Sequence, residues 1–242
     1  MTGLLDAGLP APARGAFSTR AGGVSGPPWD GFDLALHVGD DLGAVSANRE
    51  ALRRLAGVDA LAFAEQVHGS GVAVVGSGGP AGASGVDALV TTTPGLAVVV
   101  LAADCLPVVL ADPAAAVVAA AHAGRAGLLA GVLQRTVEAL IDCGADAART
   151  TAVVGPAAGA CCDAVPEEMA AEADAVLPGV RATTRNGTPS LDLRAGAVLA
   201  LALAGVSAVR HVDACTIDDP RFYSYRREGV TGRHAGLAWL AG

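Results

Sequence analysis

The sequence contains no lysine, so all 16 basic residues of the 242-residue chain are arginine. Schiff-base chemistry and a Walker-type phosphate loop both need a lysine amine and are therefore excluded. Charged residues make up only 17% of the chain and aromatic residues only 3%. Acidic residues outnumber basic ones by 24 to 16, and the resulting net charge of −8 opposes binding to nucleic acid phosphates. DNA and RNA are not expected partners.

Long hydrophobic runs are also absent. The longest, residues 96–103 and 117–121, fall far short of the ~20 residues that a membrane-spanning helix needs. The first 15 residues show neither a secretory signal nor an arginine-rich transit pattern. We therefore expect a cytoplasmic protein without a membrane segment. Hydrophobic residues make up 52% of the chain, which is enough for a core and excludes disorder over most of it.

Cysteine is scarce, and no two of the five cysteines are spaced C-x-x-C. This pattern argues against a disulfide framework and against a four-cysteine zinc knuckle. Because a free cysteine commonly behaves as a small buried hydrophobe, we interpret four of the five in that way. These four are Cys143, Cys161, Cys162 and Cys215.

The chain has no interdomain linker, although residues 76–85 form a glycine-rich loop, and we predict a single domain covering residues 1–242. Amphipathic segments with helix start or stop signals predict helices at residues 44–56, 128–143, 166–177 and 192–204. Apolar or alternating segments predict strands at residues 61–67, 71–75, 88–92, 97–103, 108–110, 117–121, 151–154, 208–212 and 235–240. Hairpin-like pairs mixed with helices favour an α+β layered sandwich over a doubly wound sheet.

The most informative segment is the hairpin predicted around Asp112 and Pro113, which together favour a type I turn. A turn symmetric about Pro113 and its successor places Cys105 directly opposite His122. Opposed residues of an antiparallel pair have Cβ atoms about 4.5–5.5 Å apart, so a thiol and an imidazole would meet on one face of the sheet. A bulge at Pro107 would instead turn Cys105 to the other face.

A neighbouring thiol and imidazole support two chemistries. Either the histidine activates the thiol as a nucleophile, or both side chains bind a metal. His68 follows the predicted strand at residues 61–67 and is our candidate for a third ligand. Two histidines and one cysteine with an open fourth position are typical of a catalytic zinc site. We interpret His37 and His211 as core or surface histidines, and His234, which follows an arginine, as solvated.

Several short stretches match a known family in order along nearly the whole chain. They are FSTRAGGVS at 17–25, HVGDD at 37–41, NR at 48–49, EQVHG at 65–69, DA at 87–88, ADCLP at 103–107, HAG at 122–124, GP at 155–156, DACT at 213–216, FYSYRR at 222–227 and TGR at 231–233. On these motifs the chain resembles the YfiH family, also described as the laccase-domain or polyphenol-oxidase-like family.

The resemblance implies a layered α/β/β/α sandwich of mixed sheets and a zinc site at the positions of His68, Cys105 and His122, with copper as the alternative metal. It also implies a purine nucleoside enzyme that phosphorolyses adenosine, inosine and methylthioadenosine and deaminates adenosine. The expected partners are then a nucleoside and phosphate, with the protein a monomer or homodimer. Other family members are linked to copper-dependent phenol oxidation or to editing of peptidoglycan precursors.

Guanidinium groups suit a phosphate clamp, because they present several donors in a planar fork. We expect substrate-binding roles for a set drawn from the matching stretches and from the segment after His122: Arg20, Ser25, Arg125, Arg226, Arg227 and Arg233. Two positions depart from the family pattern. Its Trp-Arg after His-Ala-Gly is Arg-Ala here, which moves the arginine to position 125, and its Asn-Leu before His-Val-Gly-Asp is Asp33-Leu34.

Deamination needs a proton carrier as well, and the candidates near the predicted site are His37, Glu65 and Asp104. Strand alternation predicts that Glu65 and Asp104 lie on the face opposite their neighbouring ligands.

Three other functions stay open at this point: a metal-free Cys105/His122 hydrolase or amidase acting on a cell-wall precursor, a copper-dependent polyphenol oxidase, and a non-catalytic small-molecule-binding domain. The phenol oxidase ranks low, because a single thiolate–imidazole site lacks the several histidine-rich copper centres of such enzymes.

Overall fold

The computed structural model describes residues 3–76 and 82–242. Its strands are β1 Leu4–Asp6, β2 Ala13–Ser18, β3 Ala60–Glu65, β4 Val72–Val74, β5 Gly82–Ser84, β6 Ala88–Thr91, β7 Leu96–Ala102, β8 Leu106–Asp112, β9 Val117–Ala123, β10 Thr151–Val154, β11 Arg181–Thr183, β12 Pro189–Leu191, β13 Ala208–His211 and β14 His234–Leu240. Its helices are α1 Leu42–Ala56, α2 Arg125–Leu129, α3 Val132–Asp142, the short 3-10 helix η1 Ala147–Arg149, α4 Glu167–Val176, α5 Leu193–Leu203 and α6 Tyr225–Glu228.

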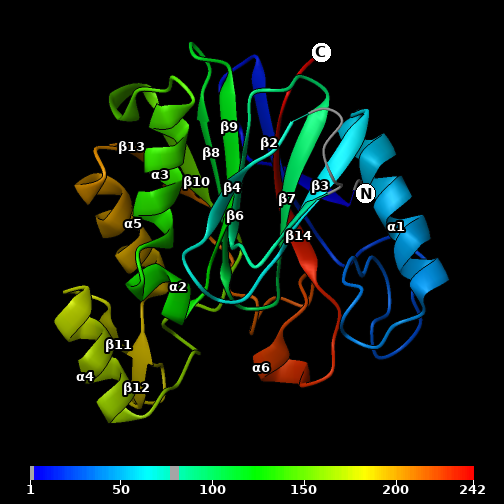
Figure 1. Cartoon of the computed structure of the whole chain (residues 1–242). Coiled ribbons are helices and arrows are strands. Elements are labelled where there is room, and N and C mark those ends of the chain that lie inside the picture. The colour runs from blue at the N-terminus through cyan, green and yellow to red at the C-terminus, as the bar shows by residue number, and fades with distance from the viewer. Residues whose placement is uncertain (1–2, 77–81) are drawn as a thin grey trace.

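The strands form two large mixed sheets that face each other, and helices cover their outer faces (Figure 1). The first sheet has the order β1-β2-β14-β7-β3-β5 and the second β13-β10-β8-β9-β6-β4. Helix α1 covers the first sheet, and α2, α3 and α5 cover the second. The predicted α+β fold, a layered α/β/β/α sandwich, is confirmed. No helix within the described residues is long and apolar enough to cross a membrane.

The central strands are buried on both faces, which explains their continuous apolar runs. In β7, Val100 packs between the two sheets, whereas Val99 packs toward α1. In β8, Val109 packs between the sheets, whereas Val108 and Leu110 pack toward the helices of the second sheet. Because side chains alternate along a strand, each strand contributes to two hydrophobic layers at once. The strands that carry the candidate site are therefore held rigidly from both sides.

Three of the four predicted helices match the structure closely. Helices α1 and α5 begin at aspartate caps, where Asp41 accepts a hydrogen bond from the Ala44 amide and Asp192 accepts one from the Ala195 amide. The predicted helix at residues 128–143 is wrong in extent. It is two helices, α2 and α3, because Gly131 between them has a φ of 84°, in the left-handed region.

The sequence prediction missed several short elements, namely β1, β2, β5, β11, β12 and α6. Most of these are only three or four residues long, too short for a periodic pattern to identify them. Of the predicted glycine-rich loop at residues 76–85, residues 77–81 lie outside the described residues, and residues 82–84 form β5.

Candidate metal centre

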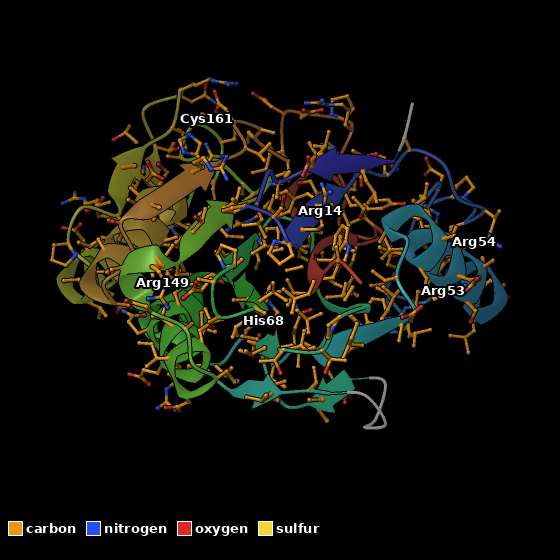
Figure 2. All side chains as sticks on the ribbon, turned by 90° about the horizontal axis from the view of Figure 1, so that it is seen from above. Arg14, Arg53, Arg54, His68, Arg149 and Cys161 are labelled. Carbon is orange, nitrogen blue, oxygen red and sulfur yellow. The ribbon has the colours of Figure 1, made fainter. Side chains whose placement is uncertain are left out.

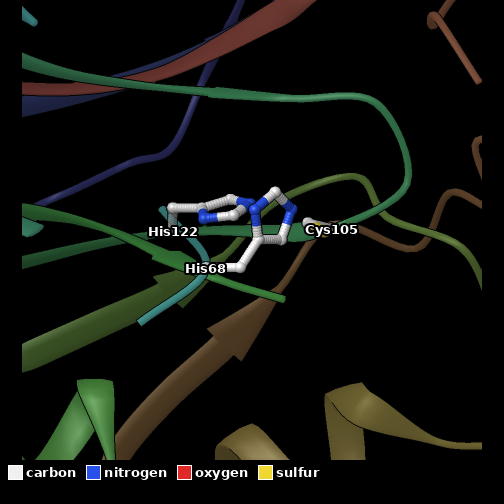
Figure 3. A group of neighbouring side chains, drawn as sticks. All are labelled: His68, Cys105 and His122. Atoms are coloured by element: carbon white, nitrogen blue, oxygen red, sulfur yellow. The ribbon is translucent and has the colours of Figure 1, made fainter. Parts of the chain in front are cut away.

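Three chain segments meet at one end of the sandwich and bring His68, Cys105 and His122 together (Figure 3). His122 is near the end of β9, and His68 follows the end of β3. Cys105 lies in the connection by which the chain leaves β7 in the first sheet and enters β8 in the second. The site therefore draws on both sheets, which is why its members are far apart in the sequence.

The potential ligand atoms of these three residues all lie within 4.8 Å of one another. The two imidazole rings meet edge to face, with centroids 4.7 Å apart and an angle of 87° between the ring planes. His122 is buried, Cys105 is partly exposed and His68 is exposed, so the cluster opens to solvent on the His68 side. Two nitrogens and one sulfur with an open side are donors of the types that can hold a metal ion and leave one position free for another ligand.

The predicted register of the hairpin is wrong by two residues, although it places the cysteine and the histidine close together. His122 pairs with Pro107 rather than with Cys105, and the turn spans residues 113–116. Cys105 lies just before β8 begins. The pairing runs without a bulge from Leu106 to Asp112, so Pro107 does not disrupt the strand. The Pro107 carbonyl accepts a hydrogen bond from the amide of Gly155, which follows β10.

Asp87, just before β6, holds two parts of the cluster at once. Its Oδ1 atom accepts the Nδ1 proton of His122 at 2.8 Å, which directs Nε2 of that ring toward the site. The same carboxylate accepts hydrogen bonds from the backbone amides of Val67, His68 and Gly69, at 3.2, 2.9 and 2.7 Å. Sequence reasoning missed this role, and its one signal was the position of Asp87 in a matching Asp-Ala stretch.

The electrostatics of the cluster favour a thiolate. Burial raises the pKa of the Cys105 thiol, but hydrogen bonds and positive charge from His122 and His68 outweigh it, so that the pKa falls to about 6. Burial lowers the pKa of His122. The hydrogen bonds to Asp87 and Cys105 raise it by more than burial lowers it, so that the net pKa is about 9. Near neutral pH in the absence of metal, the pair is therefore a thiolate beside an imidazolium.

Backbone geometry near the cluster is unusual in two places. His68 and Asp104 have φ angles of 59° and 89°, which residues other than glycine rarely adopt. The Asp87 carboxylate holds the first of these turns. Asp104 is held by its own side chain, which accepts hydrogen bonds from Thr216 Oγ1 at 2.6 Å and from the Arg226 amide at 2.7 Å. Such strain is typical of functional sites whose surroundings fix the backbone.

Two glycines make room for the cluster. A Cβ atom on Gly124 would lie 2.9 Å from the Cys105 sulfur and 3.1 Å from Cδ2 of His68. A Cβ atom on Gly127, in α2, would lie 2.6 Å from the carbonyl oxygen of Gly69. The distances of 2.9 Å at Gly124 and 2.6 Å at Gly127 are too short for a Cβ atom, so glycine is needed at each position. The segment after β9 can therefore pass directly beneath the His68 turn.

The cluster opens into a cavity of about 830 Å³. This volume lies within the range of small-molecule sites, about 300–1,000 Å³. The apolar part of the lining includes Leu36, Phe63 and Leu101, the cationic part is Arg49, Arg226 and Arg233, and the remaining groups that can transfer protons include His37, Glu65 and Asp104. Glu65, the last residue of β3, and Asp104, in the connection between β7 and β8, both line this cavity, although strand alternation predicts that they lie on the face opposite their neighbouring ligands.

Two of the residues expected to bind substrate, Arg226 and Arg233, line this cavity. Arg226 is ion-paired with Asp163 at 3.0 Å. Arg233 donates through Nη1 to the carbonyls of Thr231 and Gly232, at 2.8 and 3.0 Å. Both guanidinium groups are thus held in place from outside the cavity.

The other four expected residues do not line the cavity. Arg20 is ion-paired with Asp30 and Glu228, and Arg227 donates to backbone carbonyls, including that of Phe222 at 2.7 Å. The Ser25 hydroxyl accepts a hydrogen bond from the Asn48 amide at 2.9 Å. Arg125 is the first residue of α2.

Arg49 also lines the cavity, and sequence reasoning gave it no role. Its guanidinium group stacks over the Phe63 ring at 3.8 Å, and its Nε donates to the Leu34 carbonyl at 2.8 Å. The stacking fixes a positive charge against an apolar wall. The available signal was the Asn-Arg pair among the matching stretches.

Two further interpretations are wrong. His234 is fully buried at the start of β14, where its ring meets that of Phe222 at 5.5 Å, and burial lowers its pKa to about 4. It is therefore neutral and not solvated. The four cysteines interpreted as buried hydrophobes are all partly exposed, although Cys143 packs against the core beneath the second sheet, as that interpretation predicts. Three of them lie in loops rather than in the apolar strands that such burial requires: Cys161, Cys162 and Cys215.

Two facing mixed sheets with helices outside, and a thiolate–imidazole cluster at one end, define a layered α+β protein with a candidate metal centre. The family described as "Multi-copper polyphenol oxidoreductase laccase" matches residues 14–241. The chain belongs to this family.

Curated relatives and solved structures match over nearly the full chain. A protein of Corynebacterium glutamicum named purine nucleoside phosphorylase is 45% identical over 95% of each chain, and one of Streptomyces griseus with the same name is 48% identical over 94% of each chain. The YfiH protein of Bacillus licheniformis has a TM-score of 0.92 at 29% identity, over 99% of this chain and 97% of its own. A Neisseria meningitidis protein has a TM-score of 0.90 at 36% identity, over 99% and 100%. The resemblance to the YfiH family is confirmed.

Proposed function

We propose that this protein is a zinc-dependent purine nucleoside phosphorylase that acts on adenosine, inosine and methylthioadenosine and also deaminates adenosine. One structural observation carries the proposal: the two imidazoles and the thiolate open into a cavity of about 830 Å³ whose wall combines apolar side chains with three guanidinium groups. The names of the relatives support the same reaction class.

The donor set suits zinc at His68, Cys105 and His122, with copper as the alternative, since thiolate and imidazole are ligands of both metals. A bound ion would supply a Lewis acid that polarises a substrate oxygen or an attacking water. Asp87 keeps the Nδ1 proton on His122, so the Nε2 lone pair faces the ligand position. Gly124 leaves the space in which the cysteine sulfur and the His68 ring converge.

The cavity wall matches the two halves of a phosphorolysis reaction. Arg226 and Arg233 present guanidinium groups suited to phosphate, and Arg49 adds a third positive charge. Phe63 and Leu101 offer an apolar surface for a purine ring. Phosphate and nucleoside would thus be held side by side, and their approach would no longer cost translational freedom.

The leaving base or amine needs a proton, and two residues that line the cavity, Asp104 and His37, are candidates for supplying it. Asp104 accepts hydrogen bonds at both carboxylate oxygens, from Thr216 and from the Arg226 amide, so both oxygens already have donors. Burial and the charges of Arg233 and Arg49 lower the pKa of His37. His37 is therefore neutral at physiological pH, and its imidazole can accept a proton and return it.

The deciding experiment is incubation of zinc-loaded protein with adenosine, with and without phosphate, followed by chromatography of the products. Adenine that appears only with phosphate demonstrates phosphorolysis, and inosine that appears without phosphate demonstrates deamination. Cys105→Ser should abolish both activities, whereas Cys143→Ser, outside the cluster, should retain them. Absence of turnover with every nucleoside tested would overturn the proposal.

A second candidate function is a metal-free hydrolase or amidase. Asp87, His122 and Cys105 form a carboxylate–imidazole–thiolate series, and the pKa of about 6 at Cys105 suits a nucleophile. The two candidates differ in their need for metal. Hydrolysis of a peptidoglycan precursor by chelator-treated protein, with turnover unchanged when zinc is restored, would favour the hydrolase.

A further inference from the structure

A second cluster of side chains with metal-ligand chemistry lies outside the candidate centre. The sulfur atoms of Cys161, Cys162 and Cys215 all lie within 4.8 Å of one another. Cys161 is well separated from His68 when the molecule is viewed from above (Figure 2). We propose that these three cysteines form a second metal site, which binds a thiophilic closed-shell cation such as Zn²⁺ through three sulfur ligands.

The three sulfurs converge because two loops are pinned to each other. Cys161 and Cys162 lie in the loop after β10, and Cys215 lies in the loop after β13. Residues Ala157 and Cys215 form a parallel bridge between these loops, and the Thr216 amide donates to the Ala157 carbonyl at 3.0 Å. The Gly159 amide donates to the Cys215 sulfur itself at 3.2 Å. An N–H aimed at a sulfur stabilises the thiolate that a metal requires.

The sulfur spacing suits a single ion. Zinc–sulfur bonds of about 2.3 Å in a tetrahedral site place sulfurs ~3.8 Å apart. The Cys161 and Cys162 sulfurs are 2.9 Å apart, and no pair in the cluster exceeds 4.8 Å, so all three sulfurs are close enough to reach one ion. Binding would replace the thiol protons with metal–sulfur bonds and release those protons to solvent, with no change of oxidation state.

The surroundings provide charge and access. Two of the three cysteines, Cys161 and Cys215, line a cavity of about 920 Å³, together with Arg185. An ion could therefore enter from solvent. Three thiolates and one dication carry a net negative charge, which the nearby Arg185 guanidinium offsets in part, because Arg185 is also ion-paired with Asp218.

The site would also stiffen the wall of the larger cavity. Thr216, which follows Cys215, donates to the Asp104 carboxylate, and Asp163, which follows Cys162, is ion-paired with Arg226. An ion that ties the two loops together would fix both supports. The three cysteines touch none of the proposed zinc ligands, so this proposal does not depend on the proposed function.

The test uses the full chain with Cys105→Ser, which removes the thiolate of the first centre. This variant should retain one tightly bound zinc in competition with a chromophoric chelator, and X-ray absorption should show three sulfur neighbours at about 2.3 Å. Adding Cys215→Ser should weaken that binding by more than about 100-fold, since even the loss of a hydrogen-bonding partner of a ligand costs about 10–100-fold. Adding Cys143→Ser instead should have no effect. Zinc should therefore raise the Tm of Cys105→Ser, with or without Cys143→Ser, but not that of Cys105→Ser combined with Cys215→Ser.

A measurement on the unsubstituted protein guards against misfolded variants. Loaded with cadmium-113, it should give two resonances, one of them with the chemical shift of an all-sulfur site. A single resonance from a mixed nitrogen and sulfur site would overturn the proposal. So would equal zinc affinity of Cys105→Ser with and without Cys215→Ser, or peroxide converting two of the three thiols to a disulfide in protein that takes up no second zinc.

Discussion

The carboxylate of Asp87 accepts the Nδ1 proton of His122 at 2.8 Å and, through the same two oxygens, binds the backbone amides of the turn that carries His68. One buried side chain thus orients one histidine and positions the other. Both halves of this arrangement depend on the negative charge, because four donors converge on one carboxylate. The geometry of the centre is therefore set by a residue that does not belong to the donor set.

Replacing Asp87 by asparagine should weaken zinc binding by about 10–100-fold, the usual cost of losing a carboxylate behind a metal-ligating histidine. The amide cannot accept all four hydrogen bonds, and it no longer favours the His122 tautomer that exposes Nε2. Zinc affinity is measured by competition with a chelator. Asp112→Asn is the matched control, because Asp112 is also buried and pairs with Arg149 at the turn of the β8–β9 hairpin, far along the strands from His122. Equal loss of affinity in both variants would contradict the role of Asp87.

The two layers of the sandwich could be predicted from sequence because their causes are local. Alternating and continuous apolar runs identify β7, β8 and β9, and amphipathic patterns and glycine stops identify α1 and α5. The short strands β1 and β11 were missed, because three residues cannot display a period.

The site was only partly predictable, because its geometry depends on turns. The turn after Asp112 spans residues 113–116, and this shifts the register by two residues. A shift of two keeps each side chain on its face, which is why Cys105 and His122 still converge. The positive φ of Asp104 and the contacts of Asp87 arise from tertiary packing, which no pattern along the chain reveals.

Gly124 should be intolerant of any side chain. Alanine there would place a Cβ atom 2.9 Å from the Cys105 sulfur and 3.1 Å from the His68 ring. Because metal–ligand distances tolerate shifts of only about 0.2 Å, we expect zinc affinity to fall by more than tenfold. Gly26→Ala is the control, since no heavy atom lies within 4 Å of the added Cβ. Zinc competition on both variants tests the prediction, and unchanged affinity in Gly124→Ala would refute it.

The Cys105 thiol should react as a thiolate at neutral pH in metal-free protein. Its pKa of about 6 means that alkylation by iodoacetamide should reach a plateau above that pH and fall about tenfold per unit below it. Burial and the charge of Asp142 raise the pKa of Cys143, so its alkylation should keep rising through the alkaline range. Peptide mass spectrometry resolves the two sites. His122→Gln should move the Cys105 midpoint upward, and an unmoved midpoint would show that the imidazolium does not stabilise the thiolate.

Arg233 should contribute to the binding of phosphate rather than to the binding of the nucleoside. A charge-assisted hydrogen bond contributes about 1.5–3 kcal/mol, so Arg233→Gln should raise the KM for phosphate about 10–100-fold. Adenosine deamination uses no phosphate and should change much less, which makes it an internal control. Arg53→Gln, on the exposed face of α1 where Arg53 pairs with Glu50, should leave both rates unchanged. Steady-state kinetics at varied phosphate decide the matter, and equal loss of both activities would assign Arg233 to general stability instead.

Asp33 should destabilise the folded protein at neutral pH. It is fully buried; one of its oxygens accepts the Arg233 amide at 2.7 Å, and the other has no partner among the described residues. Burial is the main cause that raises the pKa of Asp33 to about 6, with the nearby Asp40 adding to the rise. A carboxyl whose folded pKa is raised contributes stability below its unfolded pKa of about 4, and that contribution is lost as the pH rises through the folded value.

Asp33→Asn should therefore stabilise the protein by about 1–3 kcal/mol at pH values above about 7 and have little effect at about pH 4, where both side chains are neutral. Asparagine keeps the acceptor for the Arg233 amide and adds a donor that can reach the Asp40 carboxylate. Urea unfolding at the two pH values measures the difference. Asp146→Asn, an exposed carboxylate paired with Arg149, is the control and should shift stability by no more than about 0.5 kcal/mol. A gain that is the same at both pH values would mean that the Asp33 charge is not its cause.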